Sequence, residues 1–384
     1  MNNTTKLKIF SDKSYLLDGV NSVTMLFPFW KEAREPHNYP WDRCCERYAE
    51  IGHSLFEMTS LEEADLAVMP IPWVAIRGSS WAAKENKVAL DLAIQFADKV
   101  EKAGKQVVVD FSSDASDEEI PIKNALIFRQ SLYRSRMKRA RDFAFPAWIE
   151  DIVESYLDGQ LPIRQKCEKP VVGFCGHTEK NSFKTALQTI RYQSIMFMRY
   201  GEMRISPYVG HSMRAQFLPI LSRSPAVETN FIEQERSVFI SEENFNLKQK
   251  ARLKYVGNMV ESDYIFCCRG AANYSIRIYE ALCCGRIPIF IDTDCVLPYD
   301  FAIDWKKYCV WVDEKELPQI AEKVAEFHNN LSPQEFVDLQ HECRRIWKEW
   351  LSPEGFYANF YRHFQVGVDE KAENTSESET KVLK

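Results

Sequence analysis

The sequence has little of what marks membrane, secreted or nucleic-acid-binding proteins. No apolar run reaches about 18 residues, so we expect no segment that spans a membrane. The opening MNNTTKLKIF has no apolar region after a charged one, so we expect no secretory signal peptide. The net charge is −6, so no overall basic field favours nucleic acid. Together these absences predict a cytoplasmic protein without a transmembrane segment.

Metal and disulfide scaffolds are not indicated either. The 11 cysteines are odd in number, and no pair has the CxxC spacing of a zinc site. Adjacent cysteines such as Cys267-Cys268 lie in apolar runs, as reduced core residues do. Gly173 and Gly176 are too close together for a dinucleotide-binding fingerprint. We therefore expect no metal, no NAD and no other cofactor.

Strand-like and helix-like stretches alternate along the 384 residues, a length that suggests two domains. Apolar runs predict buried parallel strands at 7–10, 64–72, 106–111, 125–128, 171–174, 264–268, 288–292 and 308–312. Helical patterns separate them, the clearest at 84–103, 182–200 and 275–284. The alternation predicts an α/β protein with two Rossmann-like, doubly wound domains.

The predicted division places an N-terminal domain at 1–165 and a C-terminal domain at 166–345. The boundary depends on the polar stretch 157–169, which lacks periodicity and is typical of a linker. Aromatic residues gather in 346–365 at helical spacing, and we expect a final helix there that docks across the domains and belongs to the core. Residues 366–384 are polar and charged, which predicts a disordered tail.

Residues 264–290 combine the parts of an anion-binding site. Within the longer stretch 264–299, a strand ends at Arg269, a loop of small residues follows with Gly270, and a helix begins near Ser275. Gly285 ends that helix. The small loop lets a ligand approach the backbone, and the helix start offers free N–H groups and the positive end of its dipole. Ser275 either caps the helix or donates to a phosphate oxygen. The segment therefore favours a bound phosphate group.

Two further charged residues extend this predicted site. Arg269 and Arg277 are suited to neutralise a diphosphate and to stabilise it as it leaves. Glu280 lies three residues after Arg277, on the same helix face, where it is suited to accept hydrogen bonds from ribose hydroxyls. The spacing alone fits an i, i+3 surface pair equally well, with Ser275 as a simple cap.

The same segment resembles the exostosin family of glycosyltransferases. That family joins a hydrophobic strand, an Arg-Gly pair, a Ser-x-Arg-x-x-Glu-Ala-Leu helix, a Gly-x-Ile-Pro turn and a later Leu-Pro. The corresponding residues here are Arg269-Gly270, Ser275-Ile276-Arg277, Glu280-Ala281-Leu282, Gly285-Arg286-Ile287-Pro288 and Leu297-Pro298. Further similarities at 62–70 and 303–312 extend the match over roughly residues 60 to 320.

The resemblance implies a GT-B architecture, in which two Rossmann-like domains face each other across a cleft. It implies a donor held by the second domain, an acceptor held by the first, and transfer with inversion from a nucleoside-diphosphate sugar, UDP-linked by preference. The implied acceptor is a glycan or a lipid-linked glycan, as in surface polysaccharide synthesis. Animal members carry a membrane anchor, and none is found in this sequence, so a bacterial-like, soluble member with at most peripheral membrane contact is expected.

An inverting transfer needs a general base near the acceptor hydroxyl, and the first domain is expected to supply it. Asp110 and Asp114 follow a strand in VVVDFSSD and are the candidates, while Asp12 and Asp18 follow the first strand. For each one taken singly, a solvated turn aspartate is the simpler interpretation. His177, expected in a loop after the first strand of the second domain, either touches the donor or is an ordinary loop residue.

Two other charged features are interpreted as structural. Asp292-Thr293-Asp294 is a DxD triplet, a metal-binding motif in glycosyltransferases of another fold, and here it is expected to be a strand-end loop. A basic cluster predicts a solvated helix face, the alternative being contact with an anionic glycan or a membrane surface: Arg134, Arg136, Lys138, Arg139 and Arg141.

Two other functions stay open at this point. The first is a glycan-binding protein that kept the fold without catalysis, which would bind sugar but no nucleotide. The second is a nucleotide-sugar epimerase of the same architecture, which would form its product without any acceptor.

Overall fold

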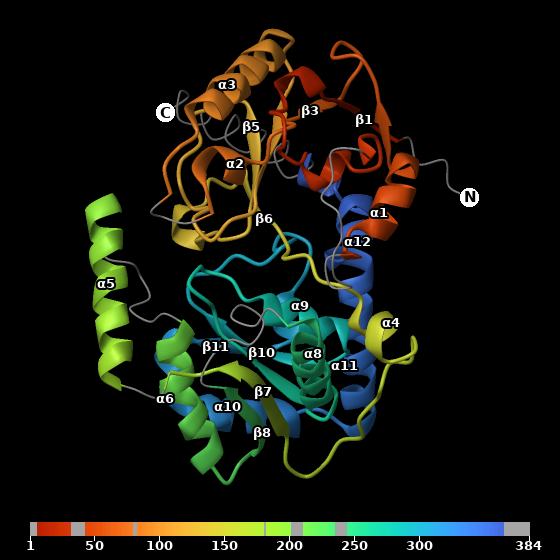
Figure 1. The fold of residues 1–384 in the computed structure, drawn as a ribbon. Helices are drawn as coiled ribbons and strands as arrows, with labels where there is room; N and C mark the ends of the chain where they lie inside the picture. Colours follow the sequence, from red (N-terminus) through yellow and green to blue (C-terminus); the bar gives the residue numbers. More distant parts are fainter. Residues whose placement is uncertain are drawn as a thin grey trace, which may run out of the picture. The chain divides into compact units, whose positions relative to one another are not determined.

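The computed structural model describes residues 6–31, 43–79, 83–179, 182–200, 210–234 and 244–364 (Figure 1). The chain divides into two compact units. Unit 1 comprises 1–150, 296–303 and 349–384, and unit 2 comprises 151–295 and 304–348. The sequence placed the first boundary at 165. The polar stretch 157–169 instead belongs to unit 2, where the backbone N–H of Arg164 donates to the Gln340 side chain at 2.9 Å.

Unit 1 is built on a six-stranded parallel sheet in the order β2-β1-β3-β4-β5-β6. The strands are β1 Leu7–Phe10, β2 Phe56–Met58, β3 Leu66–Val68, β4 Val107–Phe111, β5 Ala125–Arg129 and β6 Asp142–Ala144. The helices of this unit include α1 Glu46–Ile51, α2 Trp73–Arg77, α3 Lys87–Lys102 and α12 Pro353–Ala358.

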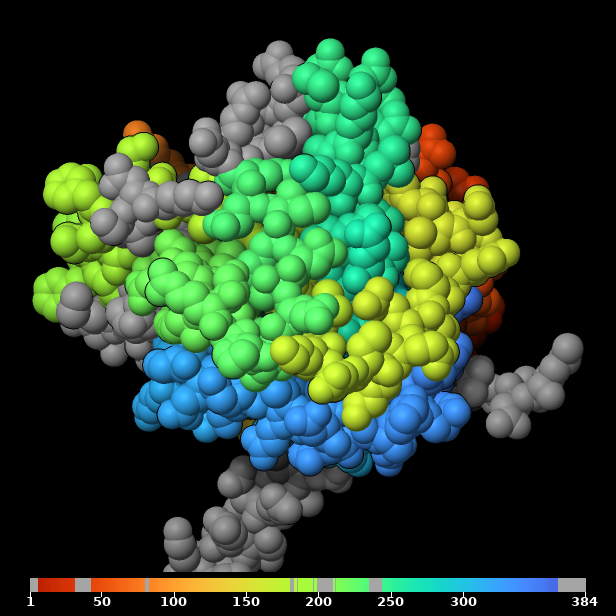
Figure 2. Space-filling view, turned by 90° about the horizontal axis from the view of Figure 1, so that it is seen from below, coloured from red at the N-terminus to blue at the C-terminus, as the bar shows by residue number. Residues whose placement is uncertain are grey.

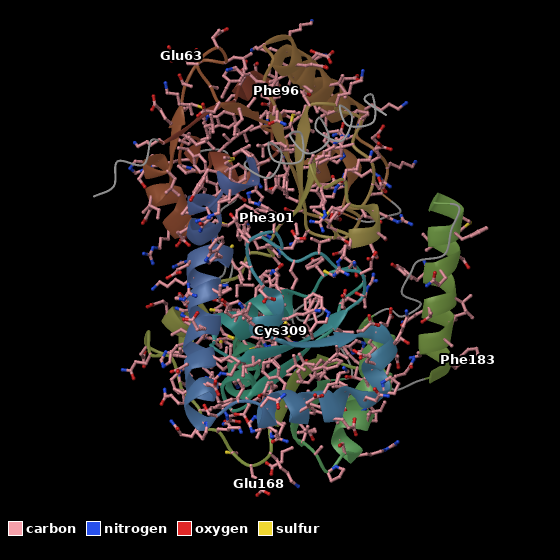
Figure 3. All side chains as sticks on the ribbon, turned by 180° about the vertical axis from the view of Figure 1, so that it is seen from behind. Glu63, Phe96, Glu168, Phe183, Phe301 and Cys309 are labelled. Carbon is pink, nitrogen blue, oxygen red and sulfur yellow. The ribbon has the colours of Figure 1, made fainter. Side chains whose placement is uncertain are left out.

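Helix α3 shows how the local sequence sets an element of this unit. The Asn86 side chain accepts from the backbone N–H of Ala89 and so caps the helix start. One face is buried, including Phe96 and Val100, and it packs into the core with strand β4 (Phe96 is labelled in Figure 3). Gly104 takes φ 68° just after the helix, a left-handed conformation that glycine adopts without strain.

Unit 2 carries a five-stranded parallel sheet in the order β11-β10-β9-β7-β8. Its strands are β7 Val171–His177, β8 Glu228–Gln234, β9 Tyr264–Cys267, β10 Ile287–Asp292 and β11 Val310–Asp313. Its helices include α4 Ile152–Tyr156, α5 Ser182–Tyr200, α6 Gly210–Arg223, α8 Phe245–Val260, α9 Ile276–Cys283, α10 Ile320–Asn329 and α11 Pro333–Ile346. Two parallel sheets with interleaved helices confirm the predicted α/β class with two doubly wound domains; the GT-B arrangement with its cleft stays a prediction.

In each sheet, the direction in which successive strands are added reverses at one point. In unit 2 the chain runs from β7 to the edge strand β8 and then returns to β9 on the other side of β7. The connections that leave β7 and β9 therefore diverge, and ligands of open α/β sheets bind at such switch points, outside the carboxyl ends of the strands. In unit 1 the equivalent point lies between β1 and β3.

The structure corrects three local expectations. Strand β7 does not end at residue 174 as predicted but continues to His177, because its last four residues still pair with β8. His177 is therefore the end of a strand and not a loop residue. The basic cluster is not a helix face: Arg134–Arg136 form a single 3-10 turn in the β5–β6 connection. There Lys138 pairs with Glu119 at 2.7 Å.

The aromatic C-terminal segment is core, as predicted. Phe356 and Phe360 are almost fully buried and lie beside Phe128 of β5 in unit 1, with ring centroids 6.0 and 4.9 Å away. The docking of this segment across both domains stays a prediction, and the predicted tail lies outside the described residues. Within the described part of the chain, no helix is both long and apolar enough for a membrane span.

Candidate functional site

The side chain of Arg277 lies at the carboxyl end of β7. Its backbone belongs to the first turn of α9, and its Nη2 donates to the Cys175 carbonyl at 2.8 Å. Its guanidinium carbon lies 4.6 Å from the centre of the Phe174 ring, a cation–π contact. A Cβ on Gly176 would come within 2.9 Å of Nη2, so this position must be glycine for the arginine to sit there undisturbed.

A second arginine makes a cation–π contact with the Phe174 ring. Arg214 of α6 lies with its guanidinium carbon 5.8 Å from the same ring centre, and its Nη1 donates to the His177 carbonyl at 3.2 Å. Its buried Nε has no hydrogen-bond partner among the described residues. Neither Arg214 nor Arg277 has a carboxylate within ion-pair distance in that part of the chain. Two guanidinium groups without a carboxylate partner at a switch point are chemically suited to hold an anion.

Glu280 is held by residues that the sequence analysis did not single out. Arg252 of α8 donates to Glu280 Oε1 at 2.8 Å, and the Tyr255 hydroxyl donates to Oε2 at 2.5 Å. Glu280 is 6% exposed. Both carboxylate oxygens of Glu280 thus already accept hydrogen bonds from α8. These bonds hold α8 against α9. The ribose contact expected of Glu280 stays a prediction.

Tyr255 connects Glu280 to Arg277. Burial, followed by the charge of Glu280, raises the pKa of the Tyr255 phenol well above its usual 10. The phenol therefore stays protonated, donates to Glu280 and accepts from Arg277 Nε at 3.3 Å. The chain Arg252–Glu280–Tyr255–Arg277 sets the orientation of the Arg277 guanidinium.

Arg269 is in the same unit but is more deeply enclosed. It is 2% exposed, and its Nη2 donates to the Tyr192 hydroxyl of α5 at 3.2 Å and to the Ala271 carbonyl at 3.1 Å. A Cβ on Gly270 would meet nothing within 4 Å, so the loop is open on that side, as a close ligand approach requires. Arg269 is thus buried next to an open side of the loop at Gly270, whereas Arg277 is half-buried.

Ser275 and His177 complete the set predicted from sequence. Ser275 stands at the N-cap of α9, but its hydroxyl caps no backbone N–H within the described residues. The hydroxyl is therefore available to a ligand at the helix start. His177 Nδ1 lies 3.1 Å from the Gln234 carbonyl, an interaction that fixes the ring at the end of β7. The structure thus brings His177 and Arg277 to the end of one strand.

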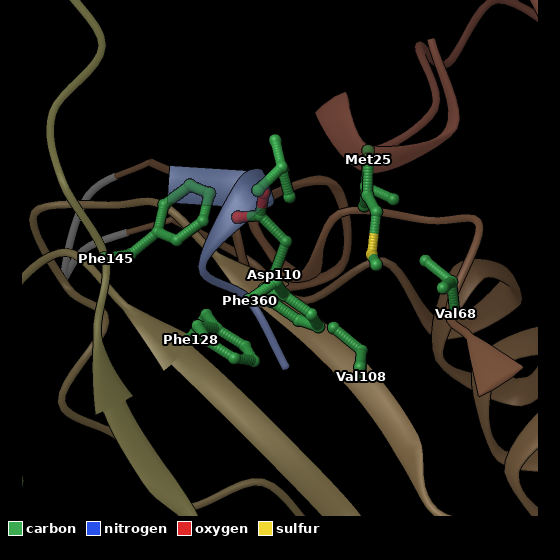
Figure 4. A pocket seen from close by; sticks show the side chains of 9 residues that line it. Met25, Val68, Val108, Asp110, Phe128, Phe145 and Phe360 are labelled. Atoms are coloured by element: carbon green, nitrogen blue, oxygen red, sulfur yellow. The ribbon is translucent and has the colours of Figure 1, made fainter. Parts of the chain in front are cut away.

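In unit 1, Asp110 is the more unusual of the two base candidates. It follows Val109 near the carboxyl end of β4 and borders a cavity of about 10 Å³, close to the least that holds one water. The other lining side chains are aliphatic or aromatic, and Figure 4 shows Phe145 and Met25 among them. Burial raises the pKa of Asp110 from 3.8 to about 6, and hydrogen bonds from the Ser112 hydroxyl and backbone oppose that rise.

Only one oxygen of the Asp110 carboxylate is engaged. The Ser112 N–H and hydroxyl both donate to Oδ1, at 2.9 and 2.5 Å. Within the described residues Oδ2 accepts no hydrogen bond. A carboxylate with one fixed oxygen, one unused oxygen and a pKa near neutrality has the properties of a general base.

The other candidates have structural surroundings. Asp12 caps a 3-10 turn and pairs with Lys99 at 3.0 Å, and Asp18 is exposed. Asp114 lies in the loop after β4 but does not border the Asp110 cavity. In the DxD triplet, Thr293 donates to the Asn273 side chain at 2.7 Å, which ties the loop after β10 to the loop before α9.

The family comparison matches a range that lies mostly in unit 2. The Exostosin GT47 domain matches residues 177–327, which confirms the predicted family for this segment. The probable glucuronosyltransferase GUT1 of rice (Oryza sativa subsp. japonica) is 25% identical, over 35% of this chain and 37% of that protein. The probable beta-1,4-xylosyltransferase IRX10L of Arabidopsis thaliana is 36% identical, over 20% of this chain and 18% of that protein. The chain thus spans well under half of these curated relatives.

A comparison of folds finds the crystal structure of TarM, at a TM-score of 0.31 and 12% identity. The match covers 73% of this chain and 59% of that one.

Proposed function

We propose that this chain is a glycosyltransferase that moves a sugar from a nucleoside-diphosphate sugar to a glycan acceptor. The match of the Exostosin GT47 domain to residues 177–327 supports this proposal. The observation that carries the proposal is the pair Arg214 and Arg277, which lie over one ring without a carboxylate partner in the described chain. A diphosphate would be the negatively charged partner of these two guanidinium groups.

The donor is bound in unit 2 with its diphosphate at the switch point between β7 and β9. Arg277 and Arg214 donate to its oxygens, and the start of α9 adds backbone N–H groups and the Ser275 hydroxyl. Arg269 approaches from the side of Gly270. These donors stabilise the charge that grows on the diphosphate as the bond to the sugar breaks. A uridine base is the preferred nucleoside, as the family resemblance implies.

The acceptor is activated by Asp110 of unit 1. Its Oδ2 takes the proton from the acceptor hydroxyl while the hydroxyl oxygen forms a bond to the anomeric carbon. The bond from that carbon to the diphosphate breaks on the opposite side, and the diphosphate leaves with the electron pair. The configuration at the anomeric carbon inverts. With a pKa near 6, Asp110 is ionised at neutral pH yet more basic than an ordinary aspartate.

A thermal-shift screen with nucleoside diphosphates and their sugars identifies the donor, because a ligand of the folded state raises the melting temperature. Release of the diphosphate is then measured with and without a glycan acceptor. Arg277→Ala is expected to lower turnover by about 10²-fold or more, as the loss of a group that stabilises developing charge does. The matched control is Arg345→Ala, which removes an exposed arginine of the same unit that pairs with Glu342.

The proposal is wrong if Arg277→Ala turns over as fast as the wild type, or if no nucleotide shifts the melting temperature. Product formation from the donor without acceptor would favour an epimerase instead.

A further inference from the structure

Helix α5 presents its apolar side to solvent. Four large apolar residues recur at spacings of four, three and seven along it, which places them on one face of a helix. Their exposed fractions are 76% for Phe183, 56% for Leu187, 63% for Ile190 and 56% for Phe197. The neighbouring Met198 is 77% exposed. Figure 3 labels Phe183 at one end of the helix.

Tyr192 lies on the opposite side of α5 and faces the protein. It is 9% and the adjacent Gln193 6% exposed, and α5 packs against α6. The Tyr192 hydroxyl accepts a hydrogen bond from Arg269. The helix is therefore inverted relative to an ordinary surface helix, whose apolar stripe covers the core. An exposed stripe of this kind marks an interaction surface.

The charged side chains within α5, α6 and α8 have one sign. Helix α5 contains three basic residues, α6 two and α8 four, and none of the three helices contains an aspartate or glutamate. The whole chain is acidic, with a net charge of −6, so these three helices differ from the rest of the chain in their charge. Arg214 and Arg252 point into the unit, whereas Lys184, Arg191 and Lys254 are exposed. Figure 2 shows α5, α6 and α8 on one face.

We propose that α5 is an interfacial helix that docks unit 2 on an anionic lipid membrane. Phe183, Leu187, Ile190 and Phe197 enter the boundary between headgroups and acyl chains, and Lys184 and Arg191 at the flanks contact the anionic headgroups. An amphipathic helix with aromatic and aliphatic residues on one face and lysine or arginine beside it binds membranes in this way. A second copy of the chain is the poorer occupant, because Lys184 and Arg191 beside one stripe would repel the same two residues beside the other.

Membrane docking by α5 is a further property beside the proposed transfer reaction, and α5 links the two. The outer face of α5 meets the membrane, while its inner face holds Arg269 through Tyr192. Docking fixes α5 and thereby the position of this arginine beside Gly270.

Vesicle flotation of the full chain, without nucleotide, tests the docking. We expect binding to vesicles of phosphatidylcholine with phosphatidylglycerol and much weaker binding to phosphatidylcholine alone. The double variant Leu187→Ser with Ile190→Ser is expected to lower partitioning at least about tenfold, because two apolar side chains no longer enter the membrane. Lys184→Ala and Arg191→Ala are expected to lower it about fivefold each, on anionic vesicles only. Val88→Ser, at a 61% exposed site of unit 1, is the matched control.

Three results would overturn the proposal. The wild type fails to float with anionic vesicles, the α5 double variant floats as the wild type does, or the α5 substitutions instead convert a dimer to a monomer in light scattering. Diphosphate binding, measured without lipid, is expected to be the same in the wild type and in Leu187→Ser with Ile190→Ser. A loss of membrane binding is thus distinguished from a failure of the proposed reaction.

Discussion

Replacement of Asp110 by asparagine separates activity from stability. The carboxylate has a pKa of about 6 in the folded protein and an ordinary value of 3.8. Because the folded value is the higher one, its contribution to stability is fully present below about pH 4 and is lost as the pH rises through 6. The rise of about 2 in pKa corresponds to roughly 3 kcal/mol, and partial exposure reduces this to about 1–3 kcal/mol.

Asp110→Asn removes this cost of ionisation while keeping an oxygen that accepts from Ser112. We expect the variant to melt a few degrees above the wild type at pH 7.5, since about 1 kcal/mol corresponds to 2–4 °C in a unit of this size. The difference should shrink as the pH falls and vanish near pH 4. Turnover should fall about 10²-fold or more, as with the loss of a general base.

The assay is a melting curve of both proteins across pH 4 to 8, together with turnover at pH 7.5. Asp114→Asn, in the loop just after β4, is the control and should show no such pH-dependent difference. The reasoning is refuted if Asp110→Asn melts below the wild type at pH 7.5, or if it keeps full turnover. A loss of turnover in Asp114→Asn alone would move the base to Asp114.

Two further predictions concern unit 2. Glu280→Ala leaves Arg252 buried and uncompensated, so we expect a loss of about 3–5 kcal/mol in urea unfolding, against at most about 1 kcal/mol for Glu342→Ala, which breaks an exposed pair. An equal effect of the two variants would contradict the structural role of Glu280. Gly176→Ala pushes on Arg277 Nη2 and should weaken diphosphate binding about tenfold at an unchanged melting temperature, whereas Gly257→Ala, whose Cβ meets nothing within 4 Å, should not. Unchanged binding in Gly176→Ala would show that Arg277 does not contact the diphosphate.

The strands with continuous apolar runs were predictable, and those without them were not. Strand β9 is fully buried and was expected at 264–268, one residue longer than observed. Strand β8, ETNFIEQ, was missed because it is an edge strand in the described sheet with charged and amide residues at several positions. The continuation of β7 through Gly176 was missed because glycine usually interrupts a strand, and here it makes room for Arg277.

The part of the candidate site that comes from one continuous segment was predictable from the sequence. Arg277, Ser275 and Gly270 belong to a single strand–loop–helix unit, so their proximity follows from local geometry. Arg214 and Tyr255 come from helices without a motif, and their partners lie 37 and 25 residues away along the chain. Only the tertiary fold brings them to β7, which is why sequence reasoning assigned Glu280 to a ligand and not to its partners on α8.

Calorimetric titration of UDP into the full chain is the most direct test of the anion site at the β7–β9 switch point. The account predicts saturable binding, a weaker affinity for UMP, and a loss of about tenfold or more for Arg214→Ala and for Arg277→Ala, with Arg345→Ala unchanged. Binding of UDP that is as tight in Arg277→Ala as in the wild type, or no binding of UDP at all, would contradict it.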